Sequence, residues 1–194
     1  MEFFMPEKPC IVKKENIGAG KYIRIEKIFF RDEKGRDRIW EGCSRQNSYG
    51  AVIIVPKIMP DDEYILVRQF RPPAGKYIIE FPAGLIDEGE SPEISAPREL
   101  YEETGYEGKI IRIFAPGFSS PGLSGETATF VLMEIDGSKY IDVIPETHQE
   151  DSENIEVFRV KSAEFYNFLQ QAIERGDGID SKLWPFAMGI NGEL

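Results

Sequence analysis

Apolar and polar residues alternate along the first quarter of the chain, and this alternation predicts antiparallel strands. It runs through residues 22–25 and 28–30, pauses at a polar stretch over 32–36, and resumes at Ile39 and Trp40. A period of two places successive side chains on opposite faces of a strand. Residues 11–48 are therefore expected to contain an antiparallel hairpin.

Further along, short runs rich in β-branched and aromatic residues predict the strands of a core sheet. Three of them lie at 51–55, 64–67 and 77–81, and three more near 109–115, 127–135 and 155–160. The polar and acidic stretch 136–154 has the composition of a surface loop.

Residues 91–104 carry the start and stop signals of a helix. Ser91 is suited to the N-cap, Pro92 to the first helical position and Gly105 to the residue that ends the helix. Pro97 lacks the N–H that an interior position donates. Either a kink or a regular helix that begins near Pro97 is therefore expected.

Two more helices are predicted near 161–175 and 181–189. In the first of these, helical spacing places four apolar residues on one face. They are Phe165, Phe168, Leu169 and Ile173. Strands interspersed with helices predict an α/β fold, in which a mixed sheet lies between helices and follows an N-terminal antiparallel β region.

Composition narrows the classes of function. A net charge of −11 argues against binding along a nucleic-acid backbone, which requires clustered Lys and Arg. No stretch reaches roughly 18 consecutive apolar residues, and the N-terminal residues lack a basic segment followed by an apolar one. Neither a membrane span nor a signal peptide is therefore expected.

Cysteine and histidine usage narrows the chemistry further. Cys10 and Cys43 lack the spacing of a zinc or redox pair, which is typical of a reduced, cytoplasmic protein. His148 is the single histidine, so Ser-His and multi-histidine metal chemistry are not expected. Any acid–base chemistry is then expected to rest on carboxylates.

The strongest chemical signal lies in GLIDEGESPEISAPRELYEETGY, residues 84–106. Glu99, Glu102 and Glu103 stand at i, i+3 and i+4, so a helix places their carboxylates on one face. Like charges so close repel one another, and a hard divalent cation such as Mg²⁺ relieves that repulsion. Arg98 lies beside this face, within reach of Glu90 or Glu102, and is expected to hold the carboxylates in register. A solvated acidic helix is the alternative interpretation.

Seven residues of this segment hold fixed separations, and with them the segment resembles the signature of the Nudix hydrolase family. They are Gly84, Glu90, Arg98, Glu99, Glu102, Glu103 and Gly105. At about 7% usage per residue type, seven matches at set positions arise by chance on the order of once in 10⁸ starting points, so the resemblance is specific.

This resemblance implies a Nudix fold that binds Mg²⁺, with Mn²⁺ as an alternative. The metal ligands that it implies are Glu99, Glu103 and the backbone carbonyl of Ala83. It places Glu102 in the catalytic group as well. Structural roles are implied for Gly84, Glu90, Arg98 and Gly105.

Stretches that extend beyond the signature resemble the ADP-ribose and ADP-sugar pyrophosphatase branch of the same family. They are ILVRQFRPPAGKYIIEFPAGLIDEGE from residue 65 and PGLSGE from residue 121. Arg71 matches an arginine that contacts substrate phosphate, a role suited to a fixed bidentate donor. Ser119 and Ser120 stand where the human member has a methionine and an aspartate, which leaves the contacts to the terminal sugar open.

The N-terminal stretch GKYIRIEKIFFRDEKGRDRIWEGCSR, residues 20–45, resembles the part of this branch that recognises the base. Trp40, Glu41 and Arg45 match positions that contact substrate. In the branch an adenine stacks between two tryptophans from different subunits, and here Tyr22 takes the first of these positions. The resemblance thus implies a homodimer that exchanges residues 1–48, followed by a Nudix domain over 49–194. Core packing of Tyr22 and Trp40 is the alternative.

The acidic run at 150–155 resembles the family loop that deprotonates the attacking water. Glu153 is the first candidate for the general base, followed by Asp151 and Glu150. The implied function is Mg²⁺-dependent hydrolysis of the diphosphate bond of nucleoside diphosphate sugars, with ADP-ribose giving AMP and ribose 5-phosphate. GDP-mannose or another nucleotide sugar, a nucleoside triphosphate, and a non-catalytic role as a nucleotide-sugar sensor remain open.

Overall fold

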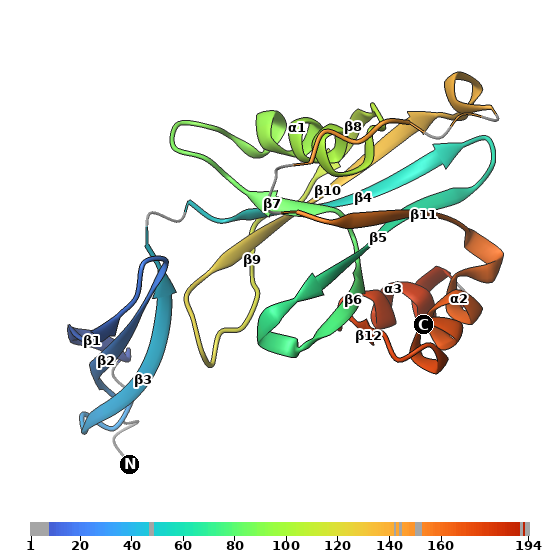
Figure 1. Cartoon of the computed structure of the whole chain (residues 1–194). Helices are drawn as coiled ribbons and strands as arrows, with labels where there is room; N and C mark the ends of the chain where they lie inside the picture. The colour runs from blue at the N-terminus through green and yellow to red at the C-terminus, as the bar shows by residue number, and fades with distance from the viewer. Residues whose placement is uncertain are drawn as a thin grey trace, which may run out of the picture. The chain divides into compact units, whose positions relative to one another are not determined.

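The computed structural model describes residues 8–46, 49–141, 143, 145–149, 153–190 and 192. The chain falls into two compact units, drawn in Figure 1. The N-terminal unit comprises residues 1–50 together with 117–128, and the second unit comprises 51–116 and 129–194. The chain therefore returns to the N-terminal unit once, through residues 117–128.

The N-terminal unit contains a three-stranded antiparallel sheet in the order β1-β2-β3. Its strands are β1 (Cys10–Ala19), β2 (Ile23–Arg31) and β3 (Asp37–Arg45). The predicted hairpin is confirmed as β2 and β3, in which Ile23 pairs with Arg45 and Arg31 with Asp37. Strand β1 was not predicted, because almost all of its residues are exposed and its sequence consequently shows no alternation of apolar and polar positions.

The turn between β2 and β3 is built around the buried carboxylate of Asp32. This carboxylate accepts hydrogen bonds from the backbone N–H groups of Lys34 and Arg36, both at 2.9 Å. It also accepts from Nε of Arg36 at 2.8 Å and Nε of Arg38 at 3.0 Å. These bonds, that of the Arg36 side chain foremost, hold the pKa of Asp32 well below its usual range.

We expect Asp32→Asn to lower the midpoint of thermal unfolding at pH 7, because the neutral amide loses the charge that Arg36 and Arg38 neutralise. A lowered pKa stabilises the fold above the ordinary aspartate pKa of 3.8, and this contribution is lost as the pH falls through the folded-state pKa. The difference between the two proteins should therefore narrow below pH 3.8, as scanning calorimetry would reveal. Asp37→Asn is the matched control, since the Asp37 side chain is 80% exposed. Equal midpoints for Asp32→Asn and the wild type at pH 7 would contradict the claim that the charge of Asp32 stabilises the turn between β2 and β3.

The second unit is organised around a mixed sheet in the order β12-β6-β5-β4-β10-β8, with β11 also paired to β5 and β7 to β4. Strand β12 pairs with β6 in parallel, whereas β5 is antiparallel to β4, β6 and β11, β7 is antiparallel to β4, and β8 is antiparallel to β10. The strands are β4 (Ala51–Met59), β5 (Glu63–Arg71), β6 (Lys76–Glu80), β7 (Ala83–Leu85), β8 (Lys109–Ile113), β10 (Thr127–Asp136), β11 (Ile155–Lys161) and β12 (Gly178–Ile179). A further short strand, β9 (Gly117–Phe118), pairs with the first residues of β10.

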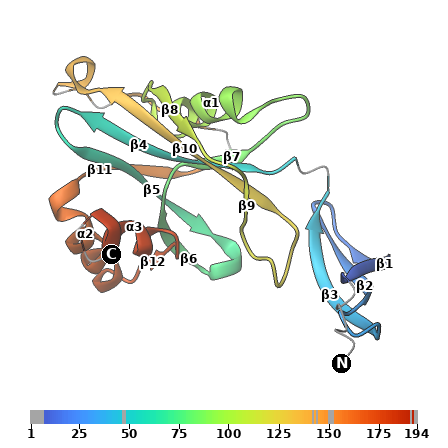
Figure 2. The same ribbon diagram turned by 180° about the vertical axis from the view of Figure 1, so that it is seen from behind.

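Helices cover both faces of this sheet, as the two opposite views in Figures 1 and 2 show. They are α1 (Pro92–Thr104), α2 (Phe165–Glu174) and α3 (Leu183–Ile190). On one face, alternate residues of β4 such as Ile54 and Ile58 pack with Leu100 of α1. On the other, Tyr64 packs edge-on against Phe165 of α2 and Phe186 of α3, with ring centroids 5.8 and 5.0 Å apart. The expected α/β fold, with a mixed sheet between helices, is confirmed.

Helix α1 begins and ends where its signals predicted. Ser91 precedes it in an extended conformation, and Gly105 follows it with a φ of 73° and donates its N–H to the carbonyl of Tyr101. The alternative that the regular helix begins near Pro97 is wrong, because α1 is already regular from Pro92. A proline in the second turn removes one hydrogen bond, and the packing of buried residues on either side of it compensates for that loss.

The last two helices are shorter than predicted. A 3₁₀ turn over Ser162–Glu164 precedes α2, and α3 starts only at Leu183. Phe165 and Leu169 are buried as predicted, whereas Ile173 is 45% exposed and Ala172 takes the buried position in the last turn of α2. Within the described residues, no helix combines the length and apolar character needed to cross a membrane.

Candidate active site

Strand β7 and helix α1 place two carboxylates against the same short stretch of backbone. Glu103 accepts a hydrogen bond from the backbone N–H of Ala83 at 3.1 Å. Glu99, one turn earlier, lies over Gly84 so closely that a Cβ added to Gly84 would be 1.9 Å from the Glu99 carboxyl carbon. Any side chain larger than hydrogen at position 84 would therefore displace the carboxylate of Glu99.

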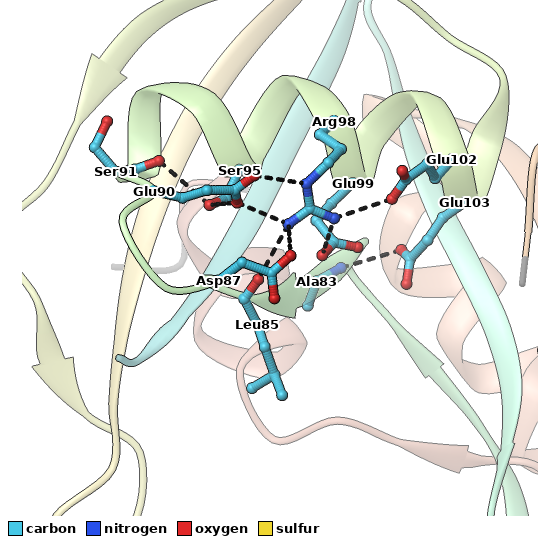
Figure 3. A network of polar contacts seen from close by, with 10 residues as sticks. All are labelled: Ala83, Leu85, Asp87, Glu90, Ser91, Ser95, Arg98, Glu99, Glu102 and Glu103. Atoms are coloured by element: carbon cyan, nitrogen blue, oxygen red, sulfur yellow. Dashed lines mark hydrogen bonds and ion pairs between the residues drawn. The ribbon is translucent and has the colours of Figure 1, made fainter. Parts of the chain in front are cut away.

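Arg98 lies at the centre of the acidic residues, as Figure 3 shows. Its NH1 contacts Glu99 at 2.9 Å and Glu102 at 3.0 Å. Its NH2 contacts Glu90 at 3.0 Å and the backbone carbonyl of Leu85 at 3.3 Å. The sequence predicted a contact with Glu90 or Glu102, and the structure brings both to Arg98 together with Glu99.

Burial makes the two carboxylates beside β7 electrostatically unusual. Only 3% of Glu103 is exposed. Desolvation raises the pKa of Glu103 to about 9, helped by the like charge of Glu99. Desolvation likewise raises the pKa of Glu99 to about 7, against the opposing effect of Arg98. Burial therefore disfavours the charged form of both carboxyl groups, and a bound cation would offset that cost.

Glu153 belongs to the same electrostatic group. Its negative charge contributes to the raised pKa of both Glu99 and Glu103. It is half-buried and precedes β11 by two residues. The other candidates for the general base, Glu150 and Asp151, lie outside the described residues.

Glu99 and Glu103 have the chemistry of ligands for a hard divalent cation. Their oxygen atoms suit Mg²⁺, which commonly takes one or two carboxylates and retains several water molecules. Across the part of the chain that the structure describes, no three Asp, Glu, His or Cys side chains gather into a metal-binding group. Glu99 and Glu103 thus fit an open site, in which two carboxylates bind the cation and water takes the other positions.

Arg71 and Glu80 form an ion pair at the ends of the neighbouring strands β5 and β6. Nε of Arg71 donates to the Glu80 carboxylate at 2.7 Å. Glu80 is buried, and desolvation raises its pKa while Arg71 opposes that shift. Glu80 was not singled out from the sequence, although a glutamate that ends the apolar run Tyr77–Glu80 is a signal for a functional or paired charge.

The N-terminal unit contains a cavity of about 710 Å³. Trp40 and Arg45 of β3 line it, together with Phe118 and Glu126 of the returning segment. The indole N–H of Trp40 donates to the carbonyl of Gly122 at 3.0 Å. Arg45 pairs with Glu126 at 3.0 Å.

Two other predicted substrate-binding residues lie elsewhere in this unit. Neither Tyr22 nor Glu41 lines the cavity that contains Trp40 and Arg45. Tyr22 is 63% exposed, with the ammonium group of Lys21 located 4.8 Å from the centre of its ring. Core packing of Tyr22 is thereby excluded within this chain.

Comparison with known proteins identifies the family. The model of the NUDIX domain matches residues 48–177. ADP-sugar pyrophosphatase of Mus musculus is 34% identical over 95% of this chain and 88% of its own length. ADP-ribose pyrophosphatase of Saccharomyces cerevisiae is 38% identical over 95% of this chain and 85% of its own.

Solved structures agree with this assignment. A crystal structure of ADP compounds hydrolase superposes with a TM-score of 0.65 at 26% identity, covering 85% of this chain and 84% of that one. Residues 48–177, which match the NUDIX domain model, contain β7, α1 and all the acidic residues that surround Arg98. The chain therefore belongs to the Nudix hydrolase family.

Proposed function

We propose that this Nudix hydrolase cleaves the diphosphate bond of nucleoside diphosphate sugars, with ADP-ribose as the main substrate and AMP and ribose 5-phosphate as products. The observation that carries the proposal is the pair of carboxyl groups held against β7, those of half-buried Glu99 and buried Glu103. The names of the mouse and yeast relatives support a substrate that contains ADP. A sensor without activity has no chemical need for such a pair.

In this mechanism Glu99, Glu103 and the backbone carbonyl of Ala83 hold Mg²⁺, with Mn²⁺ as the alternative. When bound, the cation offsets the charge of the diphosphate and makes a water molecule easier to deprotonate. Glu153 takes the proton from the attacking water. Arg98 keeps Glu99 and Glu102 in place through the contacts at 2.9 and 3.0 Å.

Arg71 binds a phosphate of the substrate in this proposal. Its Nε donates to the Glu80 carboxylate at 2.7 Å, and this bond restrains the orientation of the guanidinium group. Fixed positioning of this kind supplies much of the rate in transfers to or from phosphorus. Glu80 then has a supporting role, because it holds the arginine that contacts the phosphate.

The nucleotide part of the substrate is assigned to the N-terminal unit. Trp40 and Tyr22 offer aromatic faces for the base, and Arg45 and Glu41 offer polar contacts. Tyr22 offers a smaller ring for stacking than a tryptophan would. A preference for adenine over other bases is therefore proposed on the names of the relatives and not on this ring.

We also propose that the protein is a homodimer. Its subunits exchange the N-terminal β region, residues 1–48, which precedes the Nudix domain, residues 49–194. A three-stranded sheet with several exposed apolar residues, among them Ile23, Ile25 and Ile39, is too small to bury a core of its own. A molar mass equal to that of one chain, measured by light scattering, would contradict this dimer. A cytoplasmic location is proposed as well, and the free thiols of Cys10 and Cys43 are compatible with a reducing compartment.

The experiment that tests the function is product analysis by ion-exchange chromatography after incubation with Mg²⁺. ADP-ribose, GDP-mannose and ATP are supplied separately, and a reaction with excess chelator is the control. We expect AMP and ribose 5-phosphate from ADP-ribose at the highest rate. If GDP-mannose or ATP is cleaved faster than ADP-ribose, that compound is the main substrate instead. If none of the three is cleaved but nucleotide sugars still bind, the protein is a sensor and not an enzyme.

A further inference from the structure

The last turn of α1 is bonded to a segment that lies more than forty residues further along the chain. The final carbonyl groups of a helix have no partner within the helix itself. Here the backbone N–H of His148 donates to the carbonyl of Glu102 at 2.8 Å. Nε2 of Gln149 donates to the carbonyl of Glu103 at 3.3 Å. The imidazole of His148 also stacks on Tyr101, with centroids 4.5 Å apart and an angle of 20° between the rings.

The same Gln149 amide binds the backbone of Ile155, the first residue of β11. Its Nε2 donates to the Ile155 carbonyl at 2.9 Å. Its Oε1 accepts from the Ile155 N–H, also at 2.9 Å. A primary amide has two donor hydrogens and one acceptor oxygen, so this one side chain satisfies both backbone groups of Ile155 and a carbonyl of α1. Gln149 therefore connects the helix of the candidate ligands to the start of β11.

This connection bears on Glu153 because of its place in the sequence. Glu153 precedes Ile155 by two residues, and two residues span roughly 7 Å at most. Holding the backbone of Ile155 thus restricts where the carboxylate of Glu153 is found. The interaction of its charge with Glu99 and Glu103 places all three groups in one electrostatic neighbourhood.

We propose that Gln149 is a positioning residue for hydrolysis, which holds Glu153 at a fixed place relative to Glu99 and Glu103 by tying α1 to the start of β11. The inference rests on the proposed function, in which Glu153 takes the proton from water. Strand β11 is also held in the sheet independently of this amide, because it pairs with β5 over its full length from Ile155 to Lys161. Loss of the amide is therefore expected to affect catalysis more than stability.

The test is a double-mutant cycle on kcat and KM with ADP-ribose and saturating Mg²⁺, using Gln149→Leu, Glu153→Gln and the double variant. Leucine has a similar size but makes none of the three hydrogen bonds. We expect Gln149→Leu to lower kcat by about 30-fold with KM changed less than about twofold, because a small misplacement of a catalytic group is costly. In the Glu153→Gln background the same change should alter kcat by less than about twofold. Effects that multiply in the double variant would overturn the proposal.

Three controls separate this role from others. Gln171→Leu makes the same change on an exposed position of α2 and should leave kcat unaltered. Mn²⁺ titration followed by electron paramagnetic resonance should give the same Kd for Gln149→Leu and the wild type, since a weaker Kd would mean that Gln149 acts through Glu103. If circular dichroism shows that Gln149→Leu is unfolded, Gln149→Glu takes its place in the cycle. Glutamate still accepts the hydrogen bond from the Ile155 N–H, but it cannot donate to the carbonyls of Glu103 and Ile155.

The same variants also separate the proposed mechanism from the proposed role of Gln149. A Glu153→Gln variant with wild-type kcat would reject Glu153 as the base, and with it both the mechanism and the role of Gln149. A large loss for Glu153→Gln with no loss for Gln149→Leu would leave the mechanism intact and reject the role of Gln149 alone.

Discussion

Replacing Glu103 with glutamine is expected to lower kcat by about 10³-fold while the protein stays folded. The amide has the same shape and still accepts the hydrogen bond from Ala83, but it lacks the charge that binds a cation. A bound metal contributes several kcal/mol of transition-state stabilisation. A loss of about 4 kcal/mol corresponds to about three powers of ten in rate. Steady-state kinetics with ADP-ribose at saturating Mg²⁺ measures the change.

Thermal unfolding provides a second and independent measurement for this variant. A ligand that binds only the folded state raises the unfolding midpoint, so Mg²⁺ should stabilise the wild type and not Glu103→Gln. Without metal, the variant should be at least as stable as the wild type at neutral pH, since it removes a carboxyl group whose pKa burial raises to about 9 and whose ionisation therefore favours the unfolded chain. Glu93→Gln, on an exposed position of the same helix, is the matched control. Full activity in a folded Glu103→Gln protein would reject the metal site.

Replacing Arg98 with methionine is expected to lower both stability and activity. Four carboxylates then lose their shared counter-charge, those of Asp87, Glu90, Glu99 and Glu102. Removing one partner of a fully buried charge network costs about 3–5 kcal/mol. Because the Arg98 and Glu102 side chains are 28% and 40% exposed, solvent reduces the expected loss to about 2 kcal/mol. Urea unfolding measures the free energy, and kcat should fall at least about tenfold as Glu99 and Glu102 lose their orientation.

Two comparisons make the Arg98 result specific. Arg98→Lys keeps the positive charge but contacts fewer groups at once, so it should fall between methionine and the wild type in stability and kcat. Arg112→Met removes an arginine from an exposed position of β8 and should change neither quantity. Unchanged stability of Arg98→Met would show that the surrounding carboxylates do not depend on its charge.

Much of the catalytic helix was predictable because its signals are local. Ser91, Pro92 and Gly105 set the ends of α1 through their own backbone preferences, and the structure follows them. The i, i+3 and i+4 spacing of Glu99, Glu102 and Glu103 needs only the helical repeat to bring these residues onto one side of α1. On that side Arg98 contacts the carboxylates of Glu99 and Glu102. The hairpin of β2 and β3 was predictable for the same reason, since its period of two and its polar turn lie within adjacent residues.

Other elements lack such local signals. Strands β9 and β12 have two residues each and β7 has three, which is too short for any periodicity, so their partners alone define them. Exposed β1 has no buried face to impose alternation. Ile173 belongs to the apolar set of its helix, yet the packing of α2 left it exposed and buried Ala172 instead.

The sequence by itself determined the family, the α/β architecture and the acidic face of α1, because each depends on neighbouring residues or on spacing within one helix. Only the tertiary structure decided which distant groups meet that face. The fit of Glu99 over Gly84, the bond from Ala83 to Glu103 and the pairing of Arg71 with Glu80 all require the register of separate strands. Gln149 reaches both Glu103 and Ile155 for the same reason, since the chain must fold back before one amide contacts two segments.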